Sequence, residues 1–135
     1  MEIKRITHTL VRILNSGDFS YQDDDGQEFL AHVAPDFEAR FDTQPHKIDF
    51  DEQTDIWRQG ARDYPALTLT VLEMTATIRR RSNTGSVYLK LALTGMSDVR
   101  YQGACELNFK YTGEQWLLYR HVTMRGLLPD DSALP

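Results

Sequence analysis

His121 is the first residue to consider for a functional role, because of its chemistry and its position. It lies in the segment EQWLLYRHVTMRG, residues 114–126, whose aromatic and β-branched side chains predict a buried strand. An imidazole has an ordinary pKa of about 6.5 and can move a proton at neutral pH when a carboxylate orients it. Asp36 is the candidate carboxylate, because it stands at the entrance to the first predicted strand. In the alternative interpretation, Asp36 only shapes a turn after Pro35, and His121 is a hydrogen-bonded core or interface residue.

Several other side chains occupy positions from which they could line a ligand cavity. These candidates are Tyr101, Tyr88, Trp57, Phe37, Phe41 and His32. The two tyrosine hydroxyls could anchor a carbonyl group or stabilise an enolate. In the alternative interpretation, these tyrosines pack in the core and their hydroxyls remain in contact with water, as is usual in strands. The other aromatic residues could form the wall or lid of the cavity, and ordinary packing is their alternative role.

Composition narrows the classes of function. Fifteen Lys and Arg against twenty Asp and Glu give a net charge of −5, which disfavours nucleic acid as a partner. The single Cys105 supplies neither an intramolecular disulfide nor a cysteine cluster for a metal. No apolar run approaches the roughly 20 residues that cross a bilayer, and MEIKRITHTL does not resemble a secretory signal. The expectation is therefore a cytoplasmic protein without a membrane partner.

No motif in the sequence gives local support for a cofactor or a metal. The sequence contains no Gly-rich phosphate loop, no His-Glu-x-x-His helix and no Gly-x-Ser-x-Gly elbow. The reactions within reach are therefore those that acid–base groups drive alone: isomerisation, cyclisation, dehydration or epoxide opening.

Three helices are expected in the first half of the chain. Apolar residues at helical spacing from Ile3 to Leu14 predict the first helix, which Ser16-Gly17 ends. Asp25 and Glu28 have the spacing of a capping box and predict a short second helix that ends at Pro35.

The same spacing recurs at Asp49 and Glu52 and predicts a third helix, which stops before Pro65. Between the second and third helices, residues 37–41 alternate apolar and polar side chains as in a short strand, and residues 42–45 resemble a turn.

The second half of the chain predicts four long strands, at residues 67–78, 87–94, 101–111 and 116–125. Short turn-like gaps join them, which is typical of an antiparallel meander with the helices on one face. In the third of these strands, one face is apolar and the other polar. In the last strand neither face is entirely apolar, so the direction of His121 stays open. A partner subunit on the uncovered face would explain this mixture, so a homodimer is expected.

The order of these elements, closing in GEQWLLYRHVTMRG, resembles the nuclear transport factor 2-like superfamily, also called the SnoaL-like or cystatin-like cone. The resemblance covers nearly the whole chain. It implies an α+β cone in which three N-terminal helices cover a strongly curved antiparallel meander sheet. The cone would be one domain over residues 1–128, followed by a loose C-terminal tail at residues 129–135.

The resemblance implies function only broadly, because the superfamily includes polyketide cyclases, ketosteroid isomerase, scytalone dehydratase and many members without catalysis. It implies a cone that binds an apolar small molecule of polyketide-like or terpenoid-like character. One interpretation is a cofactor-independent isomerase, cyclase or dehydratase that uses His121 and Asp36. The other is a non-catalytic dimeric module that binds a ligand or a partner protein.

Overall fold

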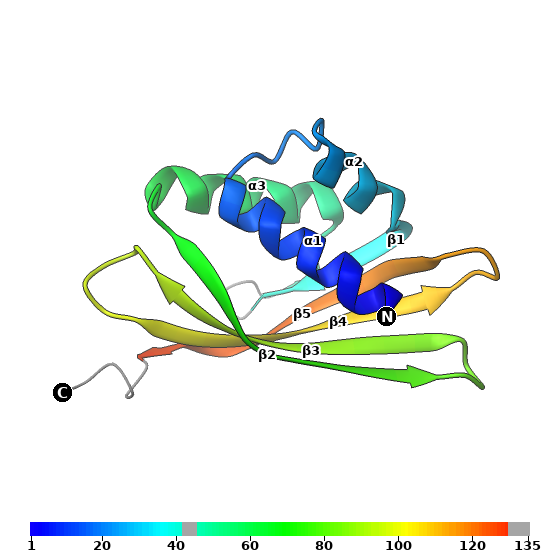
Figure 1. The fold of residues 1–135 in the computed structure, drawn as a ribbon. Helices are drawn as coiled ribbons and strands as arrows, with labels where there is room; N and C mark the ends of the chain where they lie inside the picture. Colours follow the sequence, from blue (N-terminus) through cyan, green and yellow to red (C-terminus); the bar gives the residue numbers. More distant parts are fainter. Residues whose placement is uncertain (42–45, 130–135) are drawn as a thin grey trace.

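The computed structural model describes residues 1–41 and 46–129, with side chains as far as residue 123. Within these ranges, three helices lie on one side of a single five-stranded sheet and leave its other side uncovered (Figure 1). The elements are α1 (Glu2–Ser16), α2 (Asp24–Ala31), β1 (Val33–Arg40), α3 (Phe50–Asp63), β2 (Thr68–Arg79), β3 (Thr84–Thr94), β4 (Tyr101–Tyr111) and β5 (Trp116–Pro129). This is the predicted α+β arrangement.

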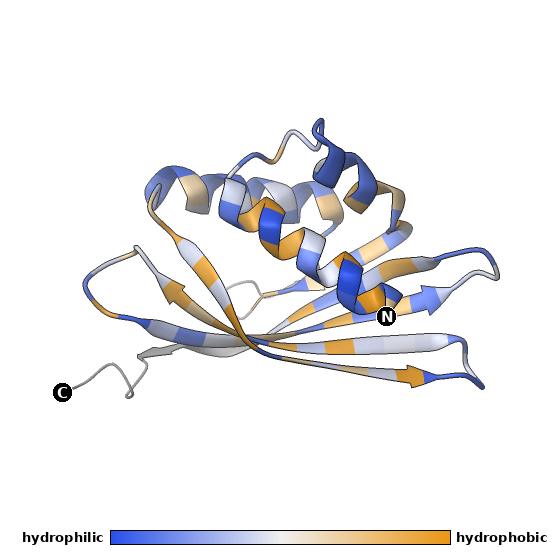
Figure 2. Ribbon diagram, viewed as in Figure 1, coloured by the Kyte–Doolittle hydropathy of each residue, from blue (hydrophilic) through white to orange (hydrophobic). Residues whose placement is uncertain are grey.

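Helices α1 and α3 form where local sequence signals place them. The buried face of α1 carries apolar residues three or four positions apart, and Gly17 ends the helix with a left-handed φ of 70°. Hydrophobic and hydrophilic residues alternate along this helix (Figure 2). The capping box of α3 is complete, because Asp49 accepts from the Glu52 backbone at 2.8 Å and Glu52 accepts from the Asp49 backbone at 3.4 Å. The predictions for both helices are confirmed.

The prediction for α2 is wrong in its cap and in its end. The N-cap is Asp23, whose side chain accepts a hydrogen bond from the Gly26 backbone at 2.7 Å, whereas Asp25 binds Arg12. The helix ends at Ala31, so Pro35 lies inside β1. Proline is tolerated there because β1 is an edge strand whose pairing is interrupted in this region.

The sheet is mixed rather than wholly antiparallel. Its strand order is β1-β5-β4-β3-β2, in which β2 to β5 form the predicted antiparallel meander and β1 pairs in parallel with β5. A bulge at Leu72 separates the Val71 and Glu73 pairs in β2, and bulges of this kind bend a strand. The predicted turn at 42–45 lies outside the described residues. Of the predicted tail, Pro129 ends β5 and residues 130–135 also lie outside them.

A second bulge, in β5, decides which way His121 points. Phe109 of β4 pairs with Leu118, but the next residue, Asn108, pairs with Arg120, so Tyr119 is an extra residue. The inserted residue shifts the alternation by one, and Leu118 and His121 therefore face the same side of the sheet. Both are buried beneath the helices, at 1% and 7% exposure.

Two glycines test the packing of the fold in opposite senses. Gly95 has a φ of +93°, and a Cβ there would lie 2.0 Å from the carbonyl oxygen of Ala66. Gly60 is helical, and a Cβ there would meet no atom within 4 Å. Gly95→Ala is expected to lower the free energy of unfolding by more than about 1 kcal/mol, and Gly60→Ala to raise it by up to about 1 kcal/mol. Urea denaturation of both variants measures the contrast, and equal effects would contradict it.

Candidate functional site

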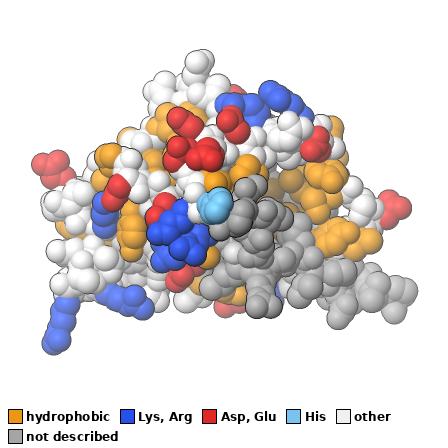
Figure 3. Space-filling model, turned by 180° about the vertical axis from the view of Figure 1, so that it is seen from behind, with side chains coloured by type: hydrophobic (Ala, Val, Ile, Leu, Met, Phe, Trp, Pro, Cys, Tyr) orange, Lys and Arg blue, Asp and Glu red, His pale blue; other side chains and the backbone are white. Residues whose placement is uncertain are grey.

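A pocket of about 630 Å³ lies between α1, α3 and the concave side of the sheet. Its walls are mostly apolar, with leucines from α1, β2 and β3, aromatic rings from α3 and the connecting segments, and small residues from β4. Among the described residues that line it there is no Asp, Glu, Lys or Arg. This described part of the lining is therefore uncharged, whereas charged side chains of both signs lie on the surface seen in Figure 3.

His121 is the ionisable group that the sequence placed first, and it lines this pocket. Its Nδ1 lies 2.9 Å from Oε1 of Gln53, and the rings of Phe41 and Trp57 meet it edge-on with centroids 5.7 and 6.0 Å away. Burial lowers the pKa of His121 to about 4, because the charged form loses its hydration. The imidazole is therefore neutral at pH 7, and because Gln53 contacts Nδ1, Nε2 is the ring nitrogen left for a ligand.

The structure does not bring Asp36 to His121. Phe37 and Ala39 of β1 point inward. Asp36 directly precedes Phe37, so it points to the opposite side, where its side chain is 70% exposed. Lys110 donates to its carboxylate at 3.0 Å, and this hydrogen bond lowers the pKa of Asp36. The predicted proton-exchange pair is therefore not formed.

Two of the predicted ligand contacts, Trp57 and Phe41, line the pocket. The other four do not. Phe37 is buried against the edge of Phe50 with ring centroids 5.5 Å apart. Tyr88 lies on the uncovered face of the sheet opposite Glu106, and Tyr101 pairs with Leu93 near the end of β4. The fourth, His32, belongs to a different cluster.

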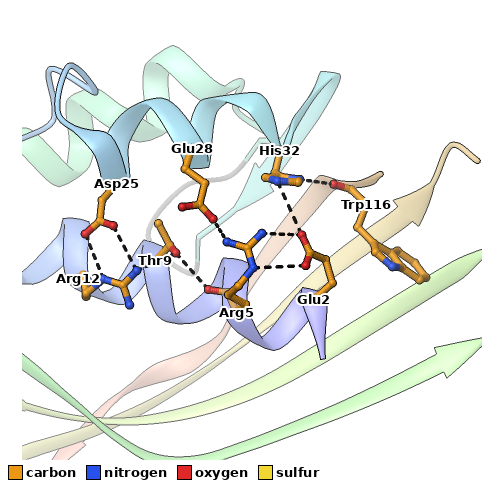
Figure 4. A network of polar contacts seen from close by, with 8 residues as sticks. All are labelled: Glu2, Arg5, Thr9, Arg12, Asp25, Glu28, His32 and Trp116. Carbon is orange, nitrogen blue, oxygen red and sulfur yellow. Dashed lines mark hydrogen bonds and ion pairs between the residues drawn. The ribbon is translucent and has the colours of Figure 1, made fainter. Parts of the chain in front are cut away.

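That cluster joins α1 to α2 and to the start of β5 (Figure 4). Nδ1 of His32 lies 2.8 Å from the carbonyl oxygen of Trp116, and its Nε2 is 3.9 Å from Glu2. Arg5 binds both Glu2 and Glu28, while Arg12 binds Asp25 at 3.0 Å. These ion pairs fasten the helices to each other at the surface, where each contributes little to stability.

Three residues near the pocket were not among the predicted site residues. Gln53 holds His121, and its spacing of three and four residues from Ile56 and Trp57 already placed it on the inner face of α3. Cys105 lines the pocket, and burial raises the pKa of its thiol to about 12. The remaining residue, Asn15, joins two elements of the fold.

Asn15 fastens the edge strand β2 to the end of α1 at the rim of the pocket. Its amide donates to the Leu69 carbonyl at 2.9 Å and accepts from the Leu69 backbone N–H at 2.7 Å. Both residues line the pocket, and they are 54 positions apart in the chain. No sequence signal links them, because the contact depends on how the helix lies across the sheet.

Residues 1–41 and 46–129 contain neither a candidate metal site nor a candidate membrane-spanning helix. No three His, Cys, Asp or Glu side chains gather there in a way that could hold a metal ion. In the same residues, no helix has both the length and the apolar character to cross a membrane.

Similar folds occur among solved structures. An uncharacterised Caulobacter vibrioides protein with a cystatin-like fold is 13% identical over 97% of this chain and 90% of its own, with a TM-score of 0.72. A candidate polyketide cyclase from Pseudomonas putida is 9% identical over 93% and 92%, with a TM-score of 0.59. AclR, a candidate hydroxylase from Streptomyces galilaeus, is 14% identical over 93% and 79%, with a TM-score of 0.61.

These likenesses show the fold alone, which is the nuclear transport factor 2-like, cystatin-like cone that the sequence resembled. No model of a protein family matches the chain. No curated protein sequence matches it either.

Burial of His121 makes stability depend on pH. The unfolded chain binds a proton on this residue near pH 6.5, whereas the folded protein resists protonation until about pH 4. The stabilising contribution is complete above pH 6.5 and is lost as the pH falls toward 4, by roughly 3 kcal/mol in all.

Urea unfolding of the wild type and His121→Phe at several pH values isolates this effect, because other titrating groups cancel in the difference. The wild type is expected to lose stability relative to the variant between pH 6.5 and 4. A difference that does not change with pH would show that His121 is not buried as described.

Proposed function

We propose that the chain binds a small, largely apolar molecule in the pocket beneath α1 and α3. The observation that carries the proposal is the pocket itself, whose volume of about 630 Å³ lies within the 300–1,000 Å³ typical of small-molecule sites. Such sites combine apolar walls with a few polar groups that orient the ligand, and His121 and Thr123 supply such groups here.

The pocket supports binding better than acid–base catalysis. Asp36 faces solvent, and no carboxylate lines the pocket among the described residues. A neutral imidazole whose conjugate acid has a pKa of about 4 is a weak base at pH 7. Isomerase, cyclase or dehydratase chemistry would need a second proton-transfer group beside His121. The candidate cyclase and hydroxylase of similar fold are too distant in sequence to supply that assignment.

Gly60 offers a way to fill the pocket without disturbing the fold. It lies one turn after Ile56 and one turn before Tyr64, and all three line the pocket. A side chain at this position projects into open space, since a Cβ there meets no atom within 4 Å. Replacing glycine inside a helix also removes a backbone cost of about 1 kcal/mol.

We expect Gly60→Leu to weaken ligand binding tenfold or more while leaving the free energy of unfolding equal or higher. The neutral dye N-phenyl-1-naphthylamine, whose fluorescence rises in apolar surroundings, reports the binding. Gln59→Leu is the matched control, because it adds the same side chain at the exposed neighbouring position of α3. Wild-type protein that does not bind the dye, or binding that survives in Gly60→Leu, would contradict the proposed site.

We also propose that the chain forms a homodimer through the uncovered face of the sheet. Tyr88, Glu106 and Val122 form a row across β3, β4 and β5 on that face, and all three are half-buried within the single chain. A second copy would cover this row, as the helices cover the opposite face. Such pairing would leave the pocket on the far side of each subunit.

Tyr88→Lys is expected to convert the dimer to a monomer, because it removes an aromatic contact and adds a charge to be buried. Within one chain the new lysine would stand opposite Glu106, so the sheet itself is not expected to suffer. Sedimentation velocity at micromolar concentrations measures the change, with His8→Lys on the exposed side of α1 as control. A monomeric wild type under these conditions would refute the dimer.

A further inference from the structure

The hydrogen bond between Gln53 and His121 determines which ring nitrogen is available inside the pocket. Gln53 is fully buried, and its Oε1 faces Nδ1 of His121 at 2.9 Å. A carbonyl oxygen only accepts, so Nδ1 must carry the proton. In a neutral imidazole the other nitrogen, Nε2, then holds a lone pair and can only accept.

Among the residues whose side chains the structure describes, none near the ring would protonate Nε2. His121 pairs in the sheet with Ala39 on one side and Leu107 on the other. Phe41 and Trp57 meet its ring, and the rest of the pocket lining is uncharged among the described residues. A ligand that enters the pocket therefore meets an unpaired hydrogen-bond acceptor in an apolar surrounding.

We infer that the pocket selects neutral, apolar molecules that carry a hydroxyl group, which donates its hydrogen bond to Nε2 of His121. The inference rests on the proposed binding function and names the ligand class of that site. A ligand with only a carbonyl or ether oxygen cannot donate to Nε2, and a lone pair of its oxygen would face the lone pair of Nε2. A carboxylate would also find no cation among the described residues of the pocket lining, and an unpaired charge is costly to bury.

Thr123 can complete the contact. It lies two residues after His121 on the same face of β5, opposite Cys105, and it lines the pocket. Its hydroxyl can both donate and accept, so it can donate to the ligand oxygen whose hydrogen is bound to Nε2.

Gln53 is a positioning residue in this arrangement. Its Nε2 is buried and has no hydrogen-bond partner among the described residues. An unpaired buried polar group is unfavourable, and an apolar side chain of similar shape would avoid that cost. The amide instead sets the proton position of the ring that faces the ligand.

Three ligands of nearly equal size test the inference by isothermal titration calorimetry at pH 7: 2-naphthol, 2-methoxynaphthalene and 2-naphthoate. For the wild type, 2-naphthol is expected to bind about 3- to 10-fold more tightly than the methyl ether, as one additional hydrogen bond would give. The carboxylate is expected to bind more weakly than either. His121→Phe should abolish the preference for the naphthol while the methyl ether still binds.

Gln53→Met keeps the length of the side chain and removes the acceptor, so it tests the positioning role separately. The preference for 2-naphthol over its ether should shrink in this variant. Stability should change little, because the unpaired Gln53 amide nitrogen is removed while Nδ1 of His121 loses its acceptor. Long-range proton–nitrogen NMR spectra of the wild type should show the proton of His121 on Nδ1.

The outcomes separate this inference from the binding function. Equal binding of naphthol and ether, tighter binding of the carboxylate, or a proton on Nε2 in the free wild type would overturn the hydroxyl preference and leave the pocket as a binding site. If none of the three ligands nor the naphthylamine dye binds, the proposed function fails, and the ligand class fails with it.

Discussion

One extra residue in β5 sets the chemistry of the interior. Without the bulge at Tyr119, strict alternation along the strand would place Leu118 and His121 on opposite faces. Either the core would lose Leu118, which is 1% exposed, or the pocket would lose its imidazole. The bulge lets one strand supply a core residue against Phe109 and, three positions later, a polar residue that reaches the pocket. Bulges near functional sites commonly redirect a side chain in this way.

The sheet around β5 separates a charged surface from a pocket whose described lining is uncharged. On the outer side of the sheet, Lys110 of β4 binds Asp36 of β1, and Glu38 lies within 3.7 Å of Arg120. These charges stay in contact with solvent, where pairing them requires little desolvation. On the inner side, burial keeps His121 neutral and the thiol of Cys105 protonated. The proposed ligand would thus be recognised through shape and single hydrogen bonds rather than through charge.

The sequence predicted those parts of the fold that local signals determine. Helical periodicity and caps placed α1 and α3, because the residues that encode them are neighbours in the chain. The run Asp23-Asp24-Asp25 holds three residues of a type that caps helices, and nothing local in the sequence shows that Asp23 is the one that accepts from the Gly26 backbone. Alternation from Phe37 implied that Asp36 points outward, so the proposed pair with His121 conflicted with the same pattern that predicted the strand. No local sequence signal predicts the parallel pairing of β1 with β5 or the bulge at Tyr119, because both depend on partners distant in sequence.

Residues that are locally unfavourable gather around the pocket. Gly60 lies inside α3, where alanine would give a more stable helix. Gln53 leaves a buried amide nitrogen without a partner among the described residues. Both lie on the inner face of α3, one beside the open space and the other against His121. Sequences that satisfy local rules elsewhere tend to break them where function requires it. A helix selected only for stability would carry an alanine and an apolar side chain at these two positions, and it would leave a smaller pocket and an imidazole without a fixed proton.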